Sequence, residues 1–136
     1  MYIPEYFILH KTENSYYFTN RDNTIVSTIS YFDYDMGGFD WILLADVETI
    51  QEYRNRGLAS SLINRLYSDI TETTDKGLYL FVLEDNDAAI SLYTKLGFIE
   101  VKTYTFEHGE HIDTGTYIIM AKGNQDLSQF DDMDFA

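Results

Sequence analysis

The central third of the chain joins an amphipathic helix to a strand that is apolar throughout. After Gly57, apolar residues recur with a period of about 3.6, which is typical of a helix that buries one face; they are Leu58, Leu62, Ile63, Leu66 and Ile70. Asp75-Lys76-Gly77 ends this pattern, and residues 78–83 are apolar on both faces, as expected for a buried central strand. The segment predicts a sheet with a helix packed on it.

The flanking sequence supplies further strands and a second helix. Aromatic and β-branched runs predict strands at 6–10, 15–19, 24–34 and 41–50, and later at 98–106 and 117–121. A second helical pattern covers about 86–96, with Gly97 as its C-terminal cap. The predicted fold class is α/β (α+β): one mixed, mostly antiparallel sheet of six to seven strands with two main helices.

The face of each residue in strand 41–50 follows from the pleat if the strand is regular. Leu43, Ala45 and Val47 then share one side, and the other side holds Ile42, Leu44, Asp46 and Glu48. Residues 1–122 form one predicted domain. Residues 123–136 are acidic and lack a period, so they predict a flexible tail that frays.

Composition limits the chemistry that the chain can perform. The absence of cysteine excludes a disulfide framework, thiolate-held zinc, an iron–sulfur cluster and a cysteine nucleophile. His108 and His111 have metal-ligand spacing, but a solvated hairpin loop accounts for them and no metal site is expected. There is no basic leader and no apolar run of about 20 residues, so we expect a cytoplasmic protein that does not enter a membrane.

The net charge of −14 leaves three interpretations open. It can serve solubility alone, form an acidic mouth for a cationic acceptor, or mimic nucleic acid with an array of carboxylates. A field of this sign repels nucleic acid, so direct nucleic-acid binding is not expected.

The segment Gln51-Glu52-Tyr53-Arg54-Asn55-Arg56-Gly57-Leu58-Ala59-Ser60 lies between a strand and a helix. The first amides of a helix lack intrahelical partners and carry partial positive charge, so they bind phosphate well. Gly57 lacks a Cβ and lets the backbone approach an anion closely. The alternative is an ordinary helix start with solvated arginines. The segment fits neither a P-loop nor a dinucleotide fingerprint.

This segment resembles the coenzyme A signature of the GNAT superfamily of N-acetyltransferases, Gln/Arg-x-x-Gly-x-Gly/Ala. Arg54, Gly57 and Ala59 fill its defined positions. About thirty residues later, NDAAISLYTKLGF at 86–98 is similar to the family's second signature, with an asparagine, an alanine, a leucine–tyrosine pair and a Gly-Phe. The resemblance covers roughly residues 41–106.

The resemblance implies acetyl-coenzyme A as co-substrate and a site between two parallel strands, 41–50 and 78–83, that splay apart. The pantetheine arm would contact the backbone of Val47, Glu48 and Thr49, together with Asn86. Tyr93 would lie near the thioester sulfur. The pyrophosphate would rest on the amides of Arg54, Asn55, Arg56, Gly57, Leu58, Ala59 and Ser60.

Two residues are predicted to catalyse the reaction. A phenol with a pKa near 10 is protonated at neutral pH, so Tyr93 can protonate the leaving thiolate; the alternative is a core aromatic. Glu48 or Asp46 can accept the proton of the amine, and Glu84 is a poorer candidate. The alternative for these carboxylates is a solvated surface of an acidic protein.

The chain departs from the family in its first third. The family has two helices between its first two strands, whereas only about residues 11–14 separate them here. The acceptor side is therefore open, or a second subunit completes it in a homodimer. The predicted function is acetyl transfer to a primary amine of a protein, a peptide or a small cationic molecule, by direct attack in a ternary complex. The alternative is a noncatalytic acidic binding or inhibitor protein on the same fold.

Overall fold

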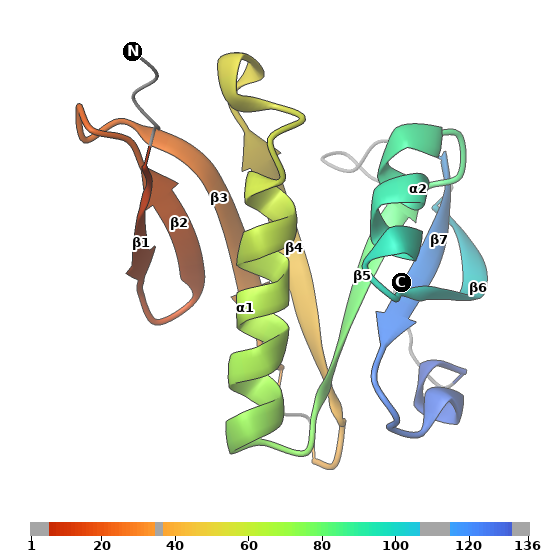
Figure 1. Ribbon diagram of the computed structural model, residues 1–136. Helices are drawn as coiled ribbons and strands as arrows, with labels where there is room; N and C mark the ends of the chain where they lie inside the picture. Colours follow the sequence, from red (N-terminus) through yellow and green to blue (C-terminus); the bar gives the residue numbers. More distant parts are fainter. Residues whose placement is uncertain (1–5, 35–36, 107–114, 132–136) are drawn as a thin grey trace.

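The computed structural model describes residues 6–34, 37–106 and 115–131. In these residues one mixed sheet has seven strands in the order β1-β2-β3-β4-β5-β7-β6. All neighbouring pairs are antiparallel except β4 and β5, which are parallel (Figure 1). The strands are β1 (Ile8–Lys11), β2 (Ser15–Thr19), β3 (Ile25–Phe32), β4 (Trp41–Thr49), β5 (Gly77–Leu83), β6 (Ile99–Phe106) and β7 (Gly115–Lys122).

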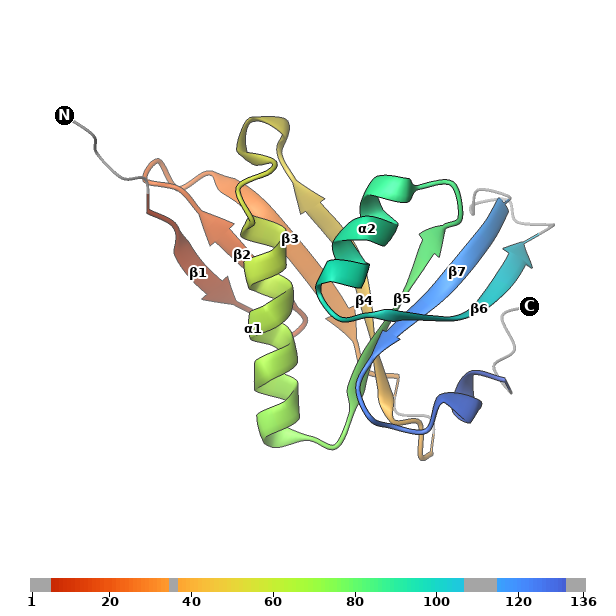
Figure 2. The same ribbon diagram turned by 45° about the vertical axis from the view of Figure 1, so that its right-hand side comes forward.

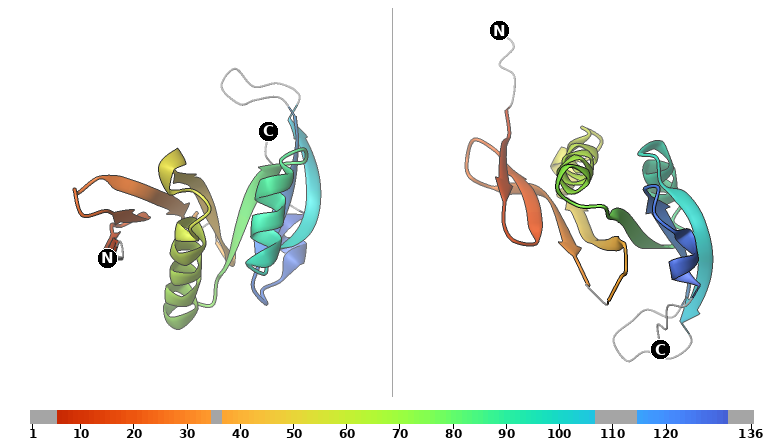
Figure 3. Two further views of the ribbon diagram at one scale, coloured as in Figure 1. Left: turned by 45° about the horizontal axis from the view of Figure 1, so that its top comes forward. Right: turned by 90° about the horizontal axis from the view of Figure 1, so that it is seen from below.

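The two main helices, α1 (Leu58–Thr73) and α2 (Asp87–Lys95), lie on the same face of the sheet, as the view from below shows (Figure 3). They pack into one apolar cluster with side chains of β2 to β5 and β7. The buried residues of α1 are those that the helical period predicted: Leu58, Leu62, Ile63, Leu66 and Ile70. The predicted fold class is confirmed, and the predicted strands differ from the observed ones by one or two residues at their ends.

A second apolar cluster covers the opposite face of the C-terminal half of the sheet. It joins Trp41 of β4, Tyr79 of β5 and two residues of β7 to Phe130, which is fully buried. Phe130 belongs to the short 3₁₀ helix η2 (Leu127–Phe130). The segment is also held by the Trp41 Nε1 group, which donates to the Asp126 carbonyl at 3.2 Å.

The predicted flexible tail therefore differs from the structure over residues 123–131. Burial of a large aromatic side chain is worth several kcal/mol and orders this segment against the sheet. The sequence lacked a period here because a single 3₁₀ turn with one anchoring residue has none. Residues 132–136, including Phe135, lie outside the described residues, as do His108 and His111.

The parallel pair of β4 and β5 is joined at one end and open at the other. Trp41, Ile42 and Leu43 pair with Gly77, Leu78 and Tyr79. Beyond Leu43 no further pairing joins the two strands, and they diverge toward the N-terminus of α1 (Figures 1 and 2). The predicted splay is confirmed.

A β-bulge at Asp46 changes the pleat of β4. Thr28 pairs with Glu48 but Ser30 pairs with Ala45, so β4 has one residue more than β3 across this step. Asp46 takes up the extra residue in the left-handed region, with φ 49°. Leu44 packs in the helix-side cluster before the bulge, and Val47 does so after it. The expectation of a regular pleat is therefore wrong beyond Asp46.

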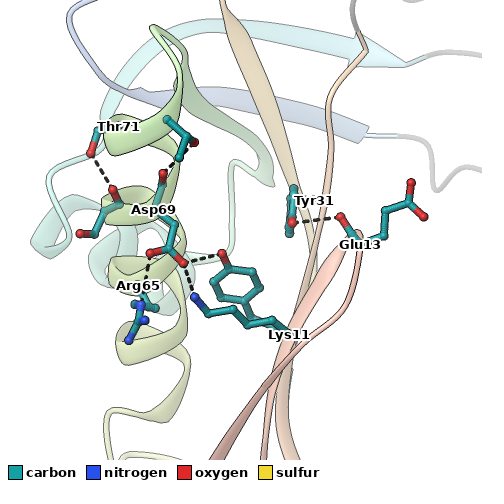
Figure 4. A network of polar contacts seen from close by, with 9 residues as sticks. Lys11, Glu13, Tyr31, Arg65, Asp69 and Thr71 are labelled. Atoms are coloured by element: carbon teal, nitrogen blue, oxygen red, sulfur yellow. Dashed lines mark hydrogen bonds and ion pairs between the residues drawn. The ribbon is translucent and has the colours of Figure 1, made fainter.

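The β1–β2 hairpin is tied to α1 by one carboxylate. Asp69 accepts from Lys11 Nζ at 2.6 Å, from the Tyr16 hydroxyl at 2.6 Å and from Arg65 Nε at 3.2 Å (Figure 4). Hydrogen bonds from Lys11 and Tyr16 lower the pKa of Asp69 to about 2. Burial and the neighbouring carboxylate raise the pKa of Tyr16 above its ordinary range.

In the described part of the chain no helix covers the face of β1 to β3 opposite α1, and η2 contacts β4 there only at its start, through Trp41 (Figure 3). Residues 12–14 alone join β1 to β2, so the family's two helices are absent from this connection, as the sequence predicted. None of the described helices is long and apolar enough to cross a bilayer.

Candidate functional site

The segment between β4 and α1 is the turn in which the sequence predicted an anion-binding site. The 3₁₀ helix η1 (Gln51–Tyr53) follows β4, and the Nε group of Arg54 donates to the Thr49 carbonyl at 2.9 Å. Asn55 has φ 64° and Gly57, the N-cap of α1, has φ 77°, so the chain turns twice through the left-handed region. No side chain caps the helix start. Its first amides are therefore available to a ligand.

Gly57 leaves space beside this helix start. A Cβ built at this position would meet no atom within 4 Å, so a side chain there would project into open space. The positive φ independently favours glycine. A phosphate can approach the bare backbone at this point, which is the property that the sequence predicted for Gly57.

A cavity of about 430 Å³ lies between the start of α1, the end of β4 and the start of α2. It unites the two sequence signatures, which are about thirty residues apart. Its walls combine backbone amides of α1 with apolar and small side chains of α2, an arrangement suited to an anionic group joined to a less polar arm. The lining residues are Val47, Thr49, Tyr53, Arg54, Asn55, Gly57, Leu58, Ala59, Ser60, Asn86, Ala88, Ala89, Leu92 and Tyr93.

Tyr93 lines this cavity from α2 and is half-buried. Its ring packs edge-on against Phe98, with 5.8 Å between the ring centroids. Burial raises the pKa of Tyr93 above its ordinary value of about 10. The side chain is thus a neutral O–H donor at physiological pH, which is the protonation state that a general acid requires.

Asn86 lines the cavity at the start of α2. Its Oδ1 atom accepts from the Ala89 amide at 3.2 Å and caps the helix. The cap fixes the orientation of this side chain at the edge of the cavity.

Two predicted site residues do not line this cavity. Arg56 places its guanidinium 4.8 Å from the centre of the Tyr53 ring and donates to the Glu52 carbonyl at 3.3 Å. Glu48 lies between two lining residues, Val47 and Thr49, and lines a separate pocket with residues of β3. The bulge accounts for the position of Glu48, because it exchanges the two faces of β4 beyond Asp46.

The other candidate bases also lie outside the cavity lining. Asp46 is exposed and occupies the bulge, and Glu84 is exposed at the end of β5. Among the described residues no group of three or more His, Cys, Asp or Glu side chains could hold a metal ion.

Four lining residues were not predicted: Tyr53, Ala88, Ala89 and Leu92. Ala89 lies three residues before Leu92 and four before Tyr93, so it shares a helix face with each of them, and this face was interpreted as core. Because Tyr93 was predicted to lie in the site, Ala89 and Leu92 could have been assigned to the same site. Tyr53 gave no such signal; its hydroxyl accepts from Asn20 Nδ2 at 3.1 Å and its ring packs edge-on against Phe7 at 5.7 Å.

Two acetyltransferases of known sequence are similar to this chain. Histone acetyltransferase MCC1 of Arabidopsis thaliana is 29% identical over 109 residues, which cover 77% of this chain and 44% of that protein. N-alpha-acetyltransferase 30 of Schizosaccharomyces pombe is 28% identical over 121 residues, covering 87% of this chain and 79% of that protein. The chain thus spans less than half the length of the first of these relatives.

Solved structures share the fold. Arabidopsis thaliana NAA60 in complex with acetyl-coenzyme A superposes with a TM-score of 0.67 at 17% identity, over 79% of this chain and 74% of that one. The ribosomal-protein-S18-alanine N-acetyltransferase of Escherichia coli gives a TM-score of 0.66 at 23% identity, over 82% of this chain and 70% of that one.

The family itself is settled by a model that spans most of the chain. The acetyltransferase (GNAT) family model matches residues 1–98, which include α1, β5 and α2 and therefore both signatures. The resemblance noted in the sequence is confirmed, and the predicted enzyme class, an acyltransferase, is the class of this family. The chain belongs to the GNAT family of acetyltransferases.

Proposed function

We propose that this protein transfers an acetyl group from acetyl-coenzyme A to a primary amine by direct attack in a ternary complex. One observation carries the proposal: an uncapped helix start and a protonated phenol line the same cavity, at the open end of two diverging strands. The helix start suits the phosphates of coenzyme A, and the phenol can donate a proton to the leaving thiolate, which speeds acetyl transfer.

The donor would be held by the two walls of the cavity. The amides of Leu58, Ala59 and Ser60, with Arg54 beside them, suit the pyrophosphate. The end of β4 at Val47 and Thr49 has backbone groups without a partner in β5, and these suit the amides of the pantetheine arm. Solved relatives bound to acetyl-coenzyme A share this fold.

Tyr93 would act as the general acid. The amine nitrogen attacks the thioester carbon, the C–S bond breaks, and the phenol proton passes to the leaving thiolate. Solvent then returns a proton to the phenolate. A contribution of about 10²- to 10⁴-fold in rate is typical for a group in this role.

The amine would approach from the face opposite the cofactor cavity, where Glu48 lies. An alkylammonium must lose a proton before it attacks, and a second as the amide forms. Glu48 is the carboxylate at the end of β4 that points to this face, so it is our candidate for accepting the proton, directly or through water.

A polypeptide is the acceptor that the open face favours. No described helix covers the face of β1 to β3 opposite α1, and a chain can lie across it (Figure 3). The names of N-alpha-acetyltransferase 30 and the S18-alanine N-acetyltransferase refer to amines of polypeptides. The acidic charge of the protein attracts a cationic acceptor.

Replacement of Tyr93 by phenylalanine tests the proposed acid. The Tyr93→Phe variant keeps the packing on Phe98 and loses the hydroxyl, so we expect kcat to fall by about 10²-fold or more while the Kd for acetyl-coenzyme A changes less than about twofold. Tyr6→Phe is the matched control, because Tyr6 is 54% exposed and outside the cavity. An unchanged kcat in Tyr93→Phe would remove the assigned acid.

The noncatalytic alternative is favoured by one observation, the net charge of −14. A binding or inhibitor protein on the GNAT fold would use this charge against a basic partner surface. It predicts neither saturable binding of acetyl-coenzyme A nor turnover with any amine, and the two hypotheses separate on these measurements.

A further inference from the structure

The turn between β4 and α1 has one side chain that leaves the surface. Among residues 51–57 only Tyr53 is not exposed, and η1 buries no residue. The Tyr53 amide donates to the Ile50 carbonyl at 2.9 Å, and Arg54 Nε donates to the Thr49 carbonyl at 2.9 Å. These two bonds join residues of the same segment, so the position of the turn relative to the sheet depends on what the Tyr53 side chain contacts.

Two residues of the N-terminal hairpin hold this side chain. The Tyr53 hydroxyl accepts from Asn20 Nδ2 at 3.1 Å, and its ring meets Phe7 edge-on with 5.7 Å between the ring centroids. Phe7 precedes β1 and Asn20 follows β2, so neither belongs to the two sequence signatures. The end of β2 and the turn after β4 lie at the same end of the sheet (Figures 1 and 2).

The side chain of Asn20 is fixed by its own turn. Its Oδ1 atom accepts from the amides of Asp22 at 2.9 Å and Thr24 at 3.0 Å. The backbone amide of Asn20 also donates to the Thr24 carbonyl at 3.0 Å. Only the oxygen of the side-chain amide can accept from these amides, so the NH₂ group is directed to Tyr53. The β2–β3 turn is thus a rigid support that presents a donor to the phenol.

Tyr53 in turn touches the phosphate end of the cavity. It lines the cavity together with Arg54 and Gly57. The guanidinium of Arg56 lies 4.8 Å from the centre of its ring, at a distance typical of a cation–π contact. A displacement of Tyr53 would therefore displace both the arginines and the backbone that leads into the uncapped start of α1.

We propose that Tyr53 holds this turn in the conformation that binds the nucleotide half of coenzyme A, and that Asn20 is the residue that positions Tyr53. The inference rests on the proposed function and gives the N-terminal hairpin a role in the affinity for the donor. Without the contact, the free turn also populates conformations whose amides do not converge on a phosphate. The observed Kd then rises by the inverse of the fraction that remains competent.

Two variants of the intact protein remove the contact from its two sides. Tyr53→Phe keeps the ring against Phe7 and loses the hydroxyl. Asn20→Ser keeps an oxygen for the turn amides but is too short to reach Tyr53. We expect each variant to raise the Kd for acetyl-coenzyme A by about three- to tenfold in calorimetric titration. The double variant should bind no more weakly than either single variant, because both changes remove the same contact.

A fragment of the donor separates this role from a general loss of stability. Adenosine 3′,5′-bisphosphate, the nucleotide half of coenzyme A, should lose affinity by the same factor in both variants. Tyr31→Phe is the matched control, because the Tyr31 hydroxyl also makes one hydrogen bond to the N-terminal hairpin, to the Glu13 carbonyl at 3.0 Å, and does not line the cavity. It should leave the Kd of both ligands unchanged.

The outcomes separate this inference from the proposed function. Wild-type binding of acetyl-coenzyme A with a Kd that neither variant changes overturns the inference and leaves acetyl transfer standing. A loss of affinity for acetyl-coenzyme A without a loss for the bisphosphate also overturns it, and additive effects in the double variant show that Asn20 does not act through Tyr53. If the wild type shows no binding at about 1 mM acetyl-coenzyme A, the proposed function is overturned and the inference with it.

Discussion

The two ends of the β4–β5 pair are built from the same two strands but differ in burial, in strand pairing and in packing. At the closed end Trp41 and Leu78 are fully buried, and the strands are hydrogen-bonded. At the open end Val47 and Thr49 are half-buried, no pairing joins the strands, and a cavity separates them from α2.

Two glycines show the same contrast at atomic scale. A Cβ on Gly77, at the closed end, would lie 2.6 Å from a Trp41 ring carbon and 2.8 Å from the Lys122 carbonyl oxygen. A Cβ on Gly57, at the open end, would meet nothing within 4 Å. At Gly77 the protein itself fills the space, whereas at Gly57 the space is open. We infer that the closed end holds the fold and the open end holds the site.

The largest effect is expected at the closed end, from Trp41→Ala. Deleting a fully buried tryptophan side chain leaves a cavity between β4 and Phe130 and should lower the free energy of unfolding by about 3–5 kcal/mol. Urea denaturation measures this loss. The folded variant should still bind acetyl-coenzyme A with a Kd within about threefold of wild type. A much weaker Kd would show that the two ends are not separable.

Gly57→Glu, at the open end, should weaken the binding of acetyl-coenzyme A more than it destabilises the fold. Its side chain occupies the space of the phosphate and adds negative charge, so we expect the affinity for acetyl-coenzyme A to fall at least about 100-fold, or about 2.7 kcal/mol, by calorimetric titration. The positive φ adds roughly 1 kcal/mol of strain to the fold. Gly38→Glu is the control, because Gly38 also has a positive φ and open space around its Cβ. Equal affinities in the two variants would move the donor away from Gly57.

Gly77→Ala should destabilise the fold without disturbing the site. The added methyl group forces Trp41 to move, which costs about 1–3 kcal/mol in urea denaturation. Gly115→Ala is the milder control, since its Cβ would lie 3.2 Å from a Leu83 methyl carbon. A variant as stable as wild type would mean that the closed end repacks easily.

The smallest effect concerns a contact outside both ends, the Asp69 carboxylate between α1 and the β1–β2 hairpin. Its pKa is lowered from 3.8 to about 2, so its contribution to stability is complete above pH 4 and is lost as the pH falls toward 2. Because the side chain is partly exposed, we expect about 1 kcal/mol from Asp69→Asn at pH 7, and less at pH 2. Glu72→Gln, on an exposed part of α1, is the control. A loss in Asp69→Asn that does not shrink with acidity would exclude this electrostatic origin.

Most of the closed end could be predicted from the sequence, because burial leaves a periodic trace. The five buried residues of α1 follow from its helical period, and the doubly apolar run of β5 marks a central strand. The positive φ of Gly97 follows from its predicted role as the C-terminal cap of α2.

The open end was less accessible to sequence reasoning. Gly57 and Tyr93 were found by motif, but the bulge at Asp46 has no sequence signal, since one aspartate in the left-handed region is a local choice imposed by neighbouring strands. Because of this extra residue in β4, Val47 faces the cavity and Glu48 does not. Phe130 was missed for a related reason: one anchor residue in a short acidic segment shows no period.

Thermal unfolding of the wild-type protein with and without acetyl-coenzyme A tests the central claim most directly. A ligand held at the open end binds the native state alone, and at about 100 times its Kd it adds about 2.7 kcal/mol, which corresponds to a rise in Tm of roughly 5 to 10 °C for a domain of this size. We predict this rise for wild type and its loss in Gly57→Glu. A Tm that is unchanged at about 1 mM acetyl-coenzyme A would contradict the account.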